Sequence, residues 1–299
     1  MKRVVITGAT SMIGVALINE CIRNNIEVVA IVRKSSSRIG RLPCSDLLRV
    51  VESDLSSLST IDLSGFSYDV FYHFAWDGTV RGPREDVLLQ WNNLKYTMDA
   101  VELAHRIGCR AFIGAGSQAE YGIYTKKIYA NMAVNPITPY GVAKYAAGKL
   151  SASYCEKYGM RSIWGRIFST YGINDNSETM IQYALRQFRV GKPAQFSAAT
   201  QMWNYLYETD AGKIFYLLGE KEGPSGTYCV ASEDTRPLKD FILEMQQVYG
   251  NDAQCIFAPP SNEKMVSLDP DITSLVEAIG WRPQTSFAEG IRKIIENIS

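Results

Sequence analysis

The segment KRVVITGATSMIG, residues 2–14, decides the fold of the first part of the chain. Residues 2–7 form a β-branched run typical of a short strand, and the apolar spacing that continues to about residue 24 is typical of a helix. Gly8 allows a tight turn between them, Gly14 allows close helix packing, and free amides at the helix start can bind a pyrophosphate. We expect a dinucleotide site here rather than a simple strand-to-helix connection, with these residues at the cofactor: Thr7, Gly8, Ser11, Met12, Ile13 and Gly14.

The composition of the 299 residues indicates a globular protein, with 46% hydrophobic and 21% charged residues. Lys+Arg and Asp+Glu both number 31, so the zero net charge gives no reason to expect a nucleic acid or an anionic membrane as partner. Six irregularly spaced cysteines are expected as reduced thiols, and with only two histidines we expect no metal site. No apolar run approaches the length of a membrane span, so a cytoplasmic protein is expected.

A basic loop follows the second expected strand, residues 27–32. In a dinucleotide fold this position carries either an acid for the adenosine ribose hydroxyls or a base for a 2′-phosphate. The loop contains Arg33, Lys34 and Arg38 and no acid. We therefore expect NADP(H) as the preferred cofactor, with NAD(H) as the second choice and an ordinary solvated basic loop as the alternative.

The ends of further expected strands belong to the same site, because ligands gather where parallel strands end on one edge of a sheet. These strands cover residues 48–52, 69–74 and 161–167. Trp76 is expected to cover the nicotinamide or to contact the substrate, and a plug of the core is the alternative. The residues expected at the cofactor are Asp54, Leu55, Phe74, Ala75, Trp76 and Ile167.

The alternation of strands and helices predicts an α/β fold with a Rossmann-like, doubly wound parallel sheet and right-handed crossovers. Residues 1–168 are expected to form the NAD(P)-binding domain. The alternation becomes less regular from residue 169, which predicts a smaller, mixed α/β, mainly substrate-binding domain in residues 169–299. No low-complexity linker separates the two, so we expect them to interlock, with roughly residues 203–232 returning to the first domain.

Tyr140 and Lys144 lie four residues apart at the start of a helix that is expected to run to about Tyr158. A phenol is a poor proton shuttle at neutral pH, and a neighbouring ammonium lowers its pKa, whereas burial raises it. The expected strand over residues 111–116 delivers Ser117 beside this pair. Hydride transfer at a carbinol needs one group that carries the proton of the oxygen and a second donor that polarises it. An ordinary amphipathic helix start is the alternative.

Several motifs occur together along the chain: Thr7-Gly8-x-x-Ser11-x-x-Gly14, His73-Phe74-Ala75, Ser117-x-x-x-Tyr121-Gly122, Tyr140-x-x-x-Lys144, Arg166-x-Phe168-x-x-Tyr171-Gly172 and the tail Gly280-Trp281-x-Pro283. In combination they resemble the extended short-chain dehydrogenase/reductase family, in particular its nucleotide-sugar epimerase, dehydratase and reductase branch. The resemblance covers essentially the whole chain. Its spacings are specific for the family and not for the reaction.

The resemblance implies roles for individual residues. Tyr140 is the implied acid/base, Lys144 lowers its pKa and holds the nicotinamide ribose, and Ser117 hydrogen-bonds the reacting oxygen. Asn93 is implied to help position Lys144 through a water or a backbone group, with an ordinary, partly exposed helix residue as the alternative. A homodimer through helices 84–107 and 140–158 is also implied, with a sugar or nucleotide sugar as substrate.

The chain departs from the family pattern where the substrate is held. Trp203 and Asn204 stand where nucleotide-sugar enzymes of the family carry an Arg-Asp pair, whose arginine often grips the substrate diphosphate. Trp203 can stack on a base or sugar ring or belong to the core, while Arg189 and Arg236 are among the residues that can supply the missing charge. The family commonly has an asparagine two residues after the phenylalanine of its Arg-x-Phe motif, whereas here Phe168 is followed by Ser169 and Thr170. The expected substrate contacts are Trp76, Gln118, Ser169, Arg189, Trp203 and Asn204.

We expect an NADPH-dependent reductase of a keto-sugar or its nucleotide derivative that uses Ser117, Tyr140 and Lys144. The same residues serve an NAD-dependent nucleotide-sugar epimerase, which is the alternative. A dehydratase is less favoured, because residues 118–120 lack the adjacent acidic pair that water elimination tends to use. A cofactor-sensing protein without catalysis is disfavoured, because such proteins typically lose the serine, the tyrosine or the lysine.

Overall fold

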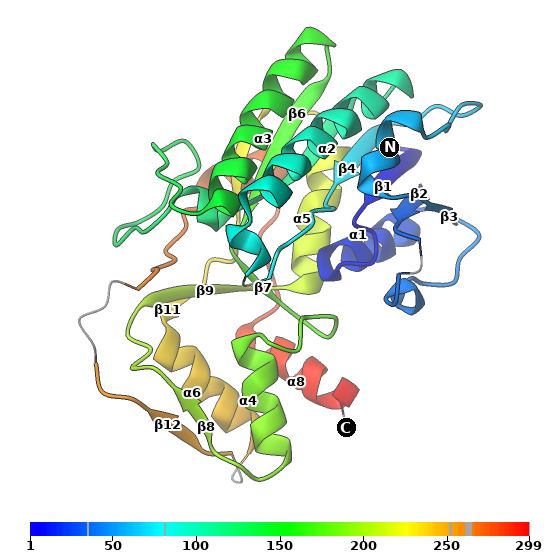
Figure 1. Ribbon diagram of the computed structural model, residues 1–299. Coiled ribbons are helices and arrows are strands. Elements are labelled where there is room, and N and C mark those ends of the chain that lie inside the picture. The colour runs from blue at the N-terminus through cyan, green and yellow to red at the C-terminus, as the bar shows by residue number, and fades with distance from the viewer. Residues whose placement is uncertain (35, 81, 251–252, 261–264, 299) are drawn as a thin grey trace.

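The large sheet of the molecule has seven parallel strands in the order β10-β6-β5-β4-β1-β2-β3 (Figure 1). The computed structural model describes residues 1–34, 36–80, 82–250, 253–260 and 265–298, so Ser35 of the basic loop lies outside the described residues. The strand order reverses between β1 and β4, which places a crevice at the carboxyl ends of the strands. The strands are β1 (Arg3–Thr7), β2 (Glu27–Val32), β3 (Leu48–Glu52), β4 (Val70–His73), β5 (Ala111–Ser117), β6 (Arg161–Ile167) and β10 (Gly226–Val230).

Helices cover both faces of this sheet because its strands are apolar on both sides. Val4 and Ile6 of β1 pack in the cluster that contains residues of α1 and α5, whereas Val5 packs in the cluster that contains residues of α2 and α3. This alternation follows from the two-residue repeat of a strand. The Rossmann-like, doubly wound parallel sheet expected from the sequence is confirmed. The helices are α1 (Met12–Arg23), α2 (Val87–Arg106), α3 (Pro139–Lys157), α5 (Glu208–Glu220) and α7 (Thr273–Ile279), which packs on α5.

The smaller part of the molecule joins two short sheets to three helices, as the expected mixed α/β portion requires (Figure 1). β9 (Met202–Tyr207) lies between β7 (Ser169–Tyr171), which is parallel to it, and β11 (Thr235–Pro237), which is antiparallel. A separate parallel pair consists of β8 (Ala194–Phe196) and β12 (Cys255–Phe257). An aromatic core that includes Phe188, Phe241 and Phe287 fills the space between the strands and the helices α4 (Met180–Arg189), α6 (Leu238–Tyr249) and α8 (Phe287–Ile298).

The chain passes from the small part back to the large one between β9 and β10. α5 packs against α1, and β10 extends the large sheet beside β6. Residues 208–230 therefore belong to the layers of the large sheet, while Trp203 belongs to β9 of the small one. The division near residue 168, with a return over roughly 203–232, stays a prediction.

The helix expected over residues 84–107 begins later than predicted. Pro83 starts a short 3-10 helix, η3 (Pro83–Glu85), and Asp86 then caps α2 by accepting the Leu89 N–H at 3.0 Å. A capping carboxylate satisfies an amide that has no partner within its own helix. Arg84 is thereby held outside α2, next to the first turn of α3.

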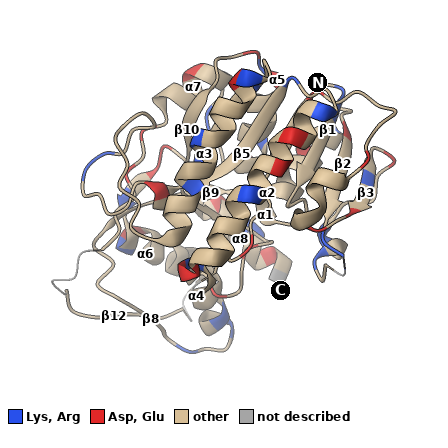
Figure 2. Ribbon diagram, turned by 45° about the horizontal axis from the view of Figure 1, so that its top comes forward, with Lys and Arg blue, Asp and Glu red and all other residues tan. Residues whose placement is uncertain are grey.

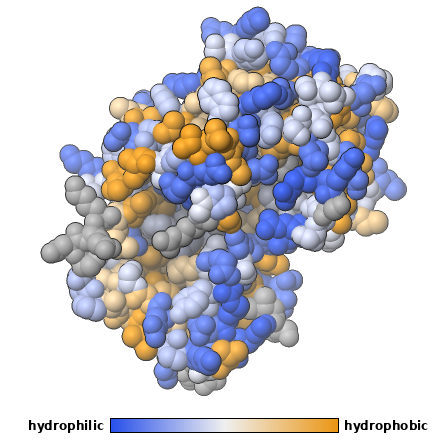
Figure 3. Space-filling model, viewed as in Figure 1, coloured by the Kyte–Doolittle hydropathy of each residue, from blue (hydrophilic) through white to orange (hydrophobic). Residues whose placement is uncertain are grey.

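The surface over α2 and α3 mixes charged and apolar residues. Figure 2 shows residues of both charge signs interspersed along the ribbons of the two helices, and Figure 3 shows hydrophobic residues gathered over their first turns. No helix within the described ranges is long and apolar enough to cross a membrane. Because its charges are mixed, the face over α2 and α3 presents no field of a single sign to a polyanion.

Candidate active site

One cavity of about 320 Å³, called here the Ser117 cavity, contains Ser117, Tyr140 and Lys144. β5 ends at Ser117, and the Thr138 hydroxyl caps α3 by accepting the Gly141 N–H at 3.1 Å. This cap defines the first turn of α3, so that Tyr140 and Lys144 follow one turn apart on the same face. The wall also includes six further residues expected at the cofactor: Ser11, Met12, Ile13, Phe74, Trp76 and Ile167.

Ser117 is held from behind by the buried acid Glu120. The backbone N–H of Ser117 donates to Oε1 of Glu120 at 2.8 Å, and the Ser117 hydroxyl accepts the Ala119 N–H at 3.2 Å. These bonds form a capping box on the short 3-10 helix η4 (Gln118–Glu120). Arg166 Nε at 2.7 Å and Trp164 Nε1 at 2.9 Å hold the Glu120 carboxylate in turn. The end of β5 is therefore fixed by groups from β6.

Tyr140 is 9% exposed, and burial raises the pKa of its phenol. A hydrogen bond with Ser117 and the nearby charge of Arg84 act toward a lower pKa. The sequence led us to expect that Lys144 lowers this pKa, and the structure differs. Lys144 Nζ lies 5.9 Å from the centre of the Tyr140 ring, and burial disfavours its own charge. Burial thus prevails at the phenol in the protein alone.

Burial lowers the pKa of Lys144 to about 7. The side-chain amine donates to the backbone oxygen of Ala115 at 2.7 Å and lies 3.7 Å from the centre of the Trp76 ring. Both contacts stabilise the ammonium, because a carbonyl oxygen and the face of an indole ring are electron-rich. Lys144 is consequently close to the midpoint of its titration at neutral pH.

We predict that Lys144→Met raises the thermal midpoint of the cofactor-free protein near neutral pH. The folded-state pKa of about 7 lies below the ordinary value of 10.5, so the folded state disfavours a proton that the unfolded state keeps. The wild type therefore gains stability as the pH rises through this window, and the advantage of the methionine variant shrinks. Thermal unfolding of both proteins at about pH 6 and about pH 10 checks this. An advantage that does not change with pH would contradict it.

A second cavity of about 180 Å³, called here the glycine-turn cavity, lies beside the first β-α turn and the basic loop. Gly8 has a φ of 68°, and a Cβ there would lie 2.6 Å from the backbone nitrogen of Ala75, so the turn requires glycine. The Ser11 hydroxyl caps α1 by accepting the Gly14 N–H at 3.1 Å. This cradle fits the pyrophosphate and ribose of a dinucleotide. Its wall includes Thr7, Gly8, Ser11, Arg33, Arg38, Leu55, Phe74, Ala75 and Trp76.

Trp76 stands where the two cavities meet. It lines both of them, together with Ser11, Phe74 and Thr79. Its indole N–H donates to Gln90 Oε1 at 2.8 Å, and its ring meets that of Tyr140 edge-on, with 6.1 Å between the ring centres. A dinucleotide that extends from the glycine turn to Ser117 passes this indole. Trp76 therefore faces the space for a ligand and is not a plug of the core.

Four residues expected at the cofactor lie outside the described walls of both cavities. Gly14 serves packing, since a Cβ there would lie 2.4 Å from a backbone oxygen of the turn. Asn93 is buried, and its amide bonds the backbone of Asp77 in both directions at 2.8 Å instead of reaching toward Lys144. Asn93 thus clamps the loop after β4, while its role in positioning Lys144 through a water or a backbone group stays a prediction. The other two, Lys34 and Asp54, are exposed.

Three expected substrate contacts are placed differently from one another. Gln118 lines a third cavity of about 330 Å³, called here the Arg84 cavity after another of its residues. On β7, Thr170 and not Ser169 lines the Ser117 cavity, because successive strand residues point to opposite sides. Arg189 is exposed in the last turn of α4 and is absent from the described walls of these cavities.

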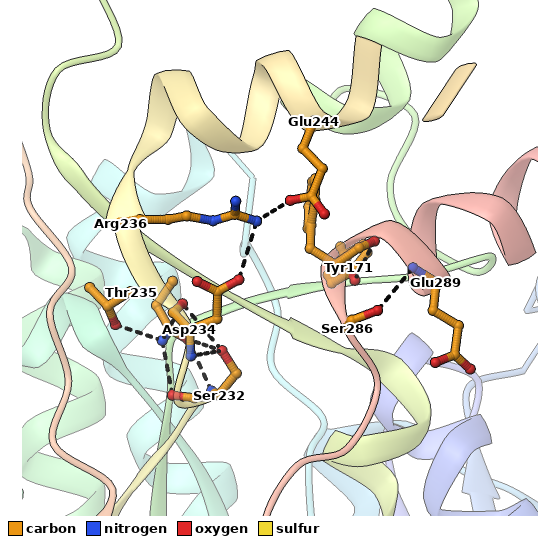
Figure 4. A network of polar contacts seen from close by, with 10 residues as sticks. Tyr171, Ser232, Asp234, Thr235, Arg236, Glu244, Ser286 and Glu289 are labelled. Atoms are coloured by element: carbon orange, nitrogen blue, oxygen red, sulfur yellow. Dashed lines mark hydrogen bonds and ion pairs between the residues drawn. The ribbon is translucent and has the colours of Figure 1, made fainter. Parts of the chain in front are cut away.

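Asn204 is a structural residue of the small part, and the expectation of a substrate contact is wrong. It is 0% exposed. Its amide donates to the Ser232 oxygen at 3.0 Å and to Thr235 Oγ1 at 2.9 Å, while its oxygen accepts the Ser232 N–H at 3.0 Å. All of its hydrogen-bonding capacity joins β9 to residues 232–235 at the start of β11. Figure 4 shows Ser232, Asp234 and Thr235 of this segment.

Trp203 and Arg236 do not replace the missing substrate arginine either. Trp203 packs against the apolar clusters of the small part, as the core alternative expected. Arg236 lies between Asp234, at 3.2 Å, and Glu244 (Figure 4). Its charge is therefore already balanced within the protein.

A fourth cavity, of about 480 Å³ and called here the Gln201 cavity, was not anticipated from the sequence. It lies between the segments at 197–202, 258–259 and 265–267, with Thr125 from the loop after η4. Oε1 of Gln201 is buried and has no hydrogen-bond partner among the described residues. An unpaired buried acceptor costs about 1–3 kcal/mol. No motif marks Gln201, because these segments meet only in the folded chain.

The parallel sheet, the glycine turn after β1 and the cavity shared by Ser117, Tyr140 and Lys144 together define an enzyme of the extended short-chain dehydrogenase/reductase class. The model of the NAD dependent epimerase/dehydratase family matches residues 4–231. The chain belongs to this family, as the motifs led us to expect.

Known relatives are named as nucleotide-sugar enzymes. The chain is 25% identical over 312 residues to a UDP-glucose 4-epimerase of Mycolicibacterium smegmatis, across 98% of this chain and 97% of the relative. It matches the UDP-N-acetylglucosamine 4-epimerase of Methanobrevibacter ruminantium, in complex with UDP-N-acetylmuramic acid, with a TM-score of 0.87 and 20% identity over 99% of this chain and 98% of that one. The match to the UDP-glucuronic acid 4-epimerase of Bacillus cereus, in complex with UDP-glucuronic acid and NAD, has a TM-score of 0.84 and 20% identity. It covers 99% of this chain and 98% of that one.

At these identities the structural matches establish the fold. The family is NAD-dependent by description, and NAD is the cofactor in the Bacillus cereus complex. Neither the expected keto-sugar reductase nor the preference for NADP(H) gains support from these relatives.

Proposed function

We propose that this chain is an NAD-dependent nucleotide-sugar 4-epimerase. The observation that carries the proposal is the cavity that brings Ser117, Tyr140 and Lys144 together, joined past Trp76 to the glycine-turn cavity. The names of the relatives supply the class of substrate and the position on the sugar. The alternative that the sequence left open is therefore the better supported one.

In the proposed reaction, the Tyr140 phenolate accepts the proton of the sugar 4-hydroxyl while the hydrogen on C4 leaves as hydride. A bound nicotinamide would supply the acceptor for this hydride and the means of its return. Ser117 donates a hydrogen bond to the reacting oxygen and stabilises the negative charge on it. After the keto-sugar has presented its other face, Tyr140 returns the proton to the oxygen. Lys144 and Trp76 would hold the nicotinamide ribose.

The position of Glu120 speaks against dehydration as the reaction. A general acid has to come within hydrogen-bond distance of the leaving hydroxyl. The Glu120 carboxylate is 0% exposed and is occupied by Arg166, by Trp164 and by the backbone N–H of Ser117. It supports the end of β5 and has no path to a substrate.

We assign the nucleotide portion of the substrate to the Gln201 cavity. The segments at 118–125 and 265–267 form walls of both this cavity and the Arg84 cavity, which brings it close to the end of β5. The described wall carries hydroxyl and amide groups without a charged side chain. A base and a ribose suit such a wall.

The NADPH-dependent keto-sugar reductase is a second candidate, favoured by the basic loop. Arg33 and Arg38 line the glycine-turn cavity, and β2 ends without an acid for the ribose hydroxyls. Arg33 lies 3.7 Å from Asp77, and both side chains are largely exposed. Such pairs contribute about 0–1 kcal/mol, so Arg33 can turn to a 2′-phosphate at little cost.

Analysis of products and cofactor together separates the two candidates. The protein is incubated with UDP-glucose, UDP-N-acetylglucosamine or UDP-glucuronic acid and a small amount of NAD, and the sugars are identified by NMR. We expect the 4-epimer to accumulate with no net change in nicotinamide absorbance. Oxidation of NADPH in proportion to the reduction of a 4-keto nucleotide sugar would overturn the epimerase and establish the reductase.

We also propose a homodimer through the outer faces of α2 and α3. A second copy of the chain can pair the same two helices about a two-fold axis and cover both apolar faces at once. Figure 3 shows the apolar surface over the first turns of these helices. The exposed apolar residues are Val87 at 65%, Leu88 at 75%, Trp91 at 66%, Val142 at 51% and Leu150 at 45%.

The double variant Leu88→Glu/Trp91→Glu is expected to be a monomer, because two carboxylates would be buried without partners in the pairing of α2 with its copy. Sedimentation or light scattering after gel filtration measures the mass. Leu243→Glu, at a 38% exposed position on α6, is the matched control and should keep the mass of the wild type. A double variant with unchanged dimer mass would exclude this face.

A further inference from the structure

Arg84 contacts the ring of the residue proposed to transfer the proton. Its guanidinium carbon lies 4.2 Å from the centre of the Tyr140 ring. The contact arises because η3 holds Arg84 outside α2, at the start of α3. Within the part of the chain that the structure describes, no carboxylate forms an ion pair with Arg84. Its charge is therefore left to act on the phenol.

Few other charged groups face Tyr140 from the elements around it. η4 contributes Glu120, whose carboxylate is already paired with Arg166 at 2.7 Å. Besides Arg84, η3 contributes Glu85, which is exposed and lines the Arg84 cavity. From β5 and from the loop after β4 come the neutral side chains of Ser117 and Trp76. The remaining group is Lys144 on α3.

Arg84 lies nearer to the Tyr140 ring than Lys144 does, and its charge is the more permanent of the two. Lys144 Nζ lies 5.9 Å from the ring centre, against 4.2 Å for the guanidinium carbon of Arg84. The pKa of Lys144, about 7, leaves this amine only partly charged at neutral pH. A guanidinium stays protonated at every physiological pH. Arg84 is thus the nearer and the permanent charge.

A cation over the face of a phenol ring favours loss of the phenolic proton. The ring already attracts the cation through its quadrupole, and a phenolate adds a full negative charge to that attraction. The same cation disfavours the ammonium form of Lys144. The first effect brings Tyr140 closer to the state in which it can accept a proton.

We propose that Arg84 is a positioning residue that holds the Tyr140 ring and favours its phenolate form. Arg84 reaches neither sugar nor cofactor in this role and acts through Tyr140. The inference rests on the proposed role of Tyr140 as acid and base, and it is independent of which sugar is epimerised or reduced.

A spectroscopic titration tests the inference without turnover. The tyrosinate absorbance of the wild type minus that of Tyr140→Phe isolates the titration of this one phenol. The same difference is then measured in the background of Arg84→Gln. We expect the titration to move to higher pH, with about tenfold less phenolate at a given pH, since an opposite charge at this distance shifts a pKa by about one unit or more. Arg84→Lys, which keeps the positive charge, should restore part of the lost phenolate fraction.

Activity provides a second readout once a substrate is known. The acid limb of the pH profile of kcat/KM should move to higher pH in Arg84→Gln. In Arg84→Lys it should lie between the limbs of the wild type and of Arg84→Gln. Arg292→Gln removes an exposed cation from α8 and should leave the limb unchanged. If Arg84→Gln fails to fold, Arg84→Met, whose chain can still cover the ring, replaces it in both measurements.

The two proposals can fail separately. An Arg84→Gln titration that coincides with that of the wild type would overturn the inference even where activity falls. A shifted titration in a protein that epimerises none of the nucleotide sugars would leave the inference standing and refute the proposed function.

Discussion

The Tyr140→Phe enzyme is expected to bind its cofactor normally and to lose about a thousandfold in kcat, which lies within the range for the loss of a general acid/base. Only the hydroxyl is removed. The ring keeps its contacts with Arg84 at 4.2 Å and with Trp76 at 6.1 Å. The proton of the sugar hydroxyl then loses the carrier proposed for it, and the Ser117 hydroxyl loses its hydrogen-bond partner.

Cofactor affinity by quenching of protein fluorescence and turnover by product analysis are measured on the same preparation. Tyr145→Phe is the matched control, since Tyr145 lies on α3 but lines a cavity away from Ser117. The control should turn over as the wild type does. If Tyr140→Phe retained turnover within about tenfold of the wild type, Tyr140 would be excluded as the acid/base.

Glu120→Gln is expected to destabilise the protein by about 3–5 kcal/mol, the usual cost of removing one partner from a buried ion pair. Glu120 is 0% exposed, and the Arg166 side chain is 5% exposed. Glutamine keeps the shape and can still accept the Ser117 N–H. The Arg166 guanidinium, however, remains buried without a counter-charge, and that is the source of the cost.

Unfolding by urea measures this effect against Glu156→Gln, an exposed position on α3 that should change stability by less than about 0.5 kcal/mol. The double variant Glu120→Gln/Arg166→Met should recover part of the loss, because it removes the unpaired charge. A Glu120→Gln protein as stable as the Glu156→Gln control would show that the pair does not hold the end of β5.

Local patterns were sufficient to predict the scaffold of the site. The strand before Gly8, the helix after it and the position of Ser117 at the end of β5 follow from periodicities of two and of about four residues. Tyr140 and Lys144 share a face of α3 for the same reason. These features depend on neighbours within a few residues along the chain, and the structure reproduces them.

Predictions that depended on the direction of a side chain failed more often. Asn204, expected to contact the substrate, bonds residues 232–235 at the start of β11 instead. Thr170 lines the Ser117 cavity in place of the expected Ser169, because strand neighbours face opposite ways. A motif places a residue near a site, whereas the packing of distant segments decides what its side chain bonds.

The sequence by itself determined the family, the parallel sheet, the glycine turn and the placing of Ser117, Tyr140 and Lys144 in one site. Only the tertiary structure decided the charges around the phenol. Burial lowers the pKa of Lys144 to about 7, and η3 brings Arg84 to within 4.2 Å of the Tyr140 ring centre. A spacing of four residues specifies that two side chains are neighbours, but the pKa of each depends on burial and on charges from other segments. Those come together only when the chain folds.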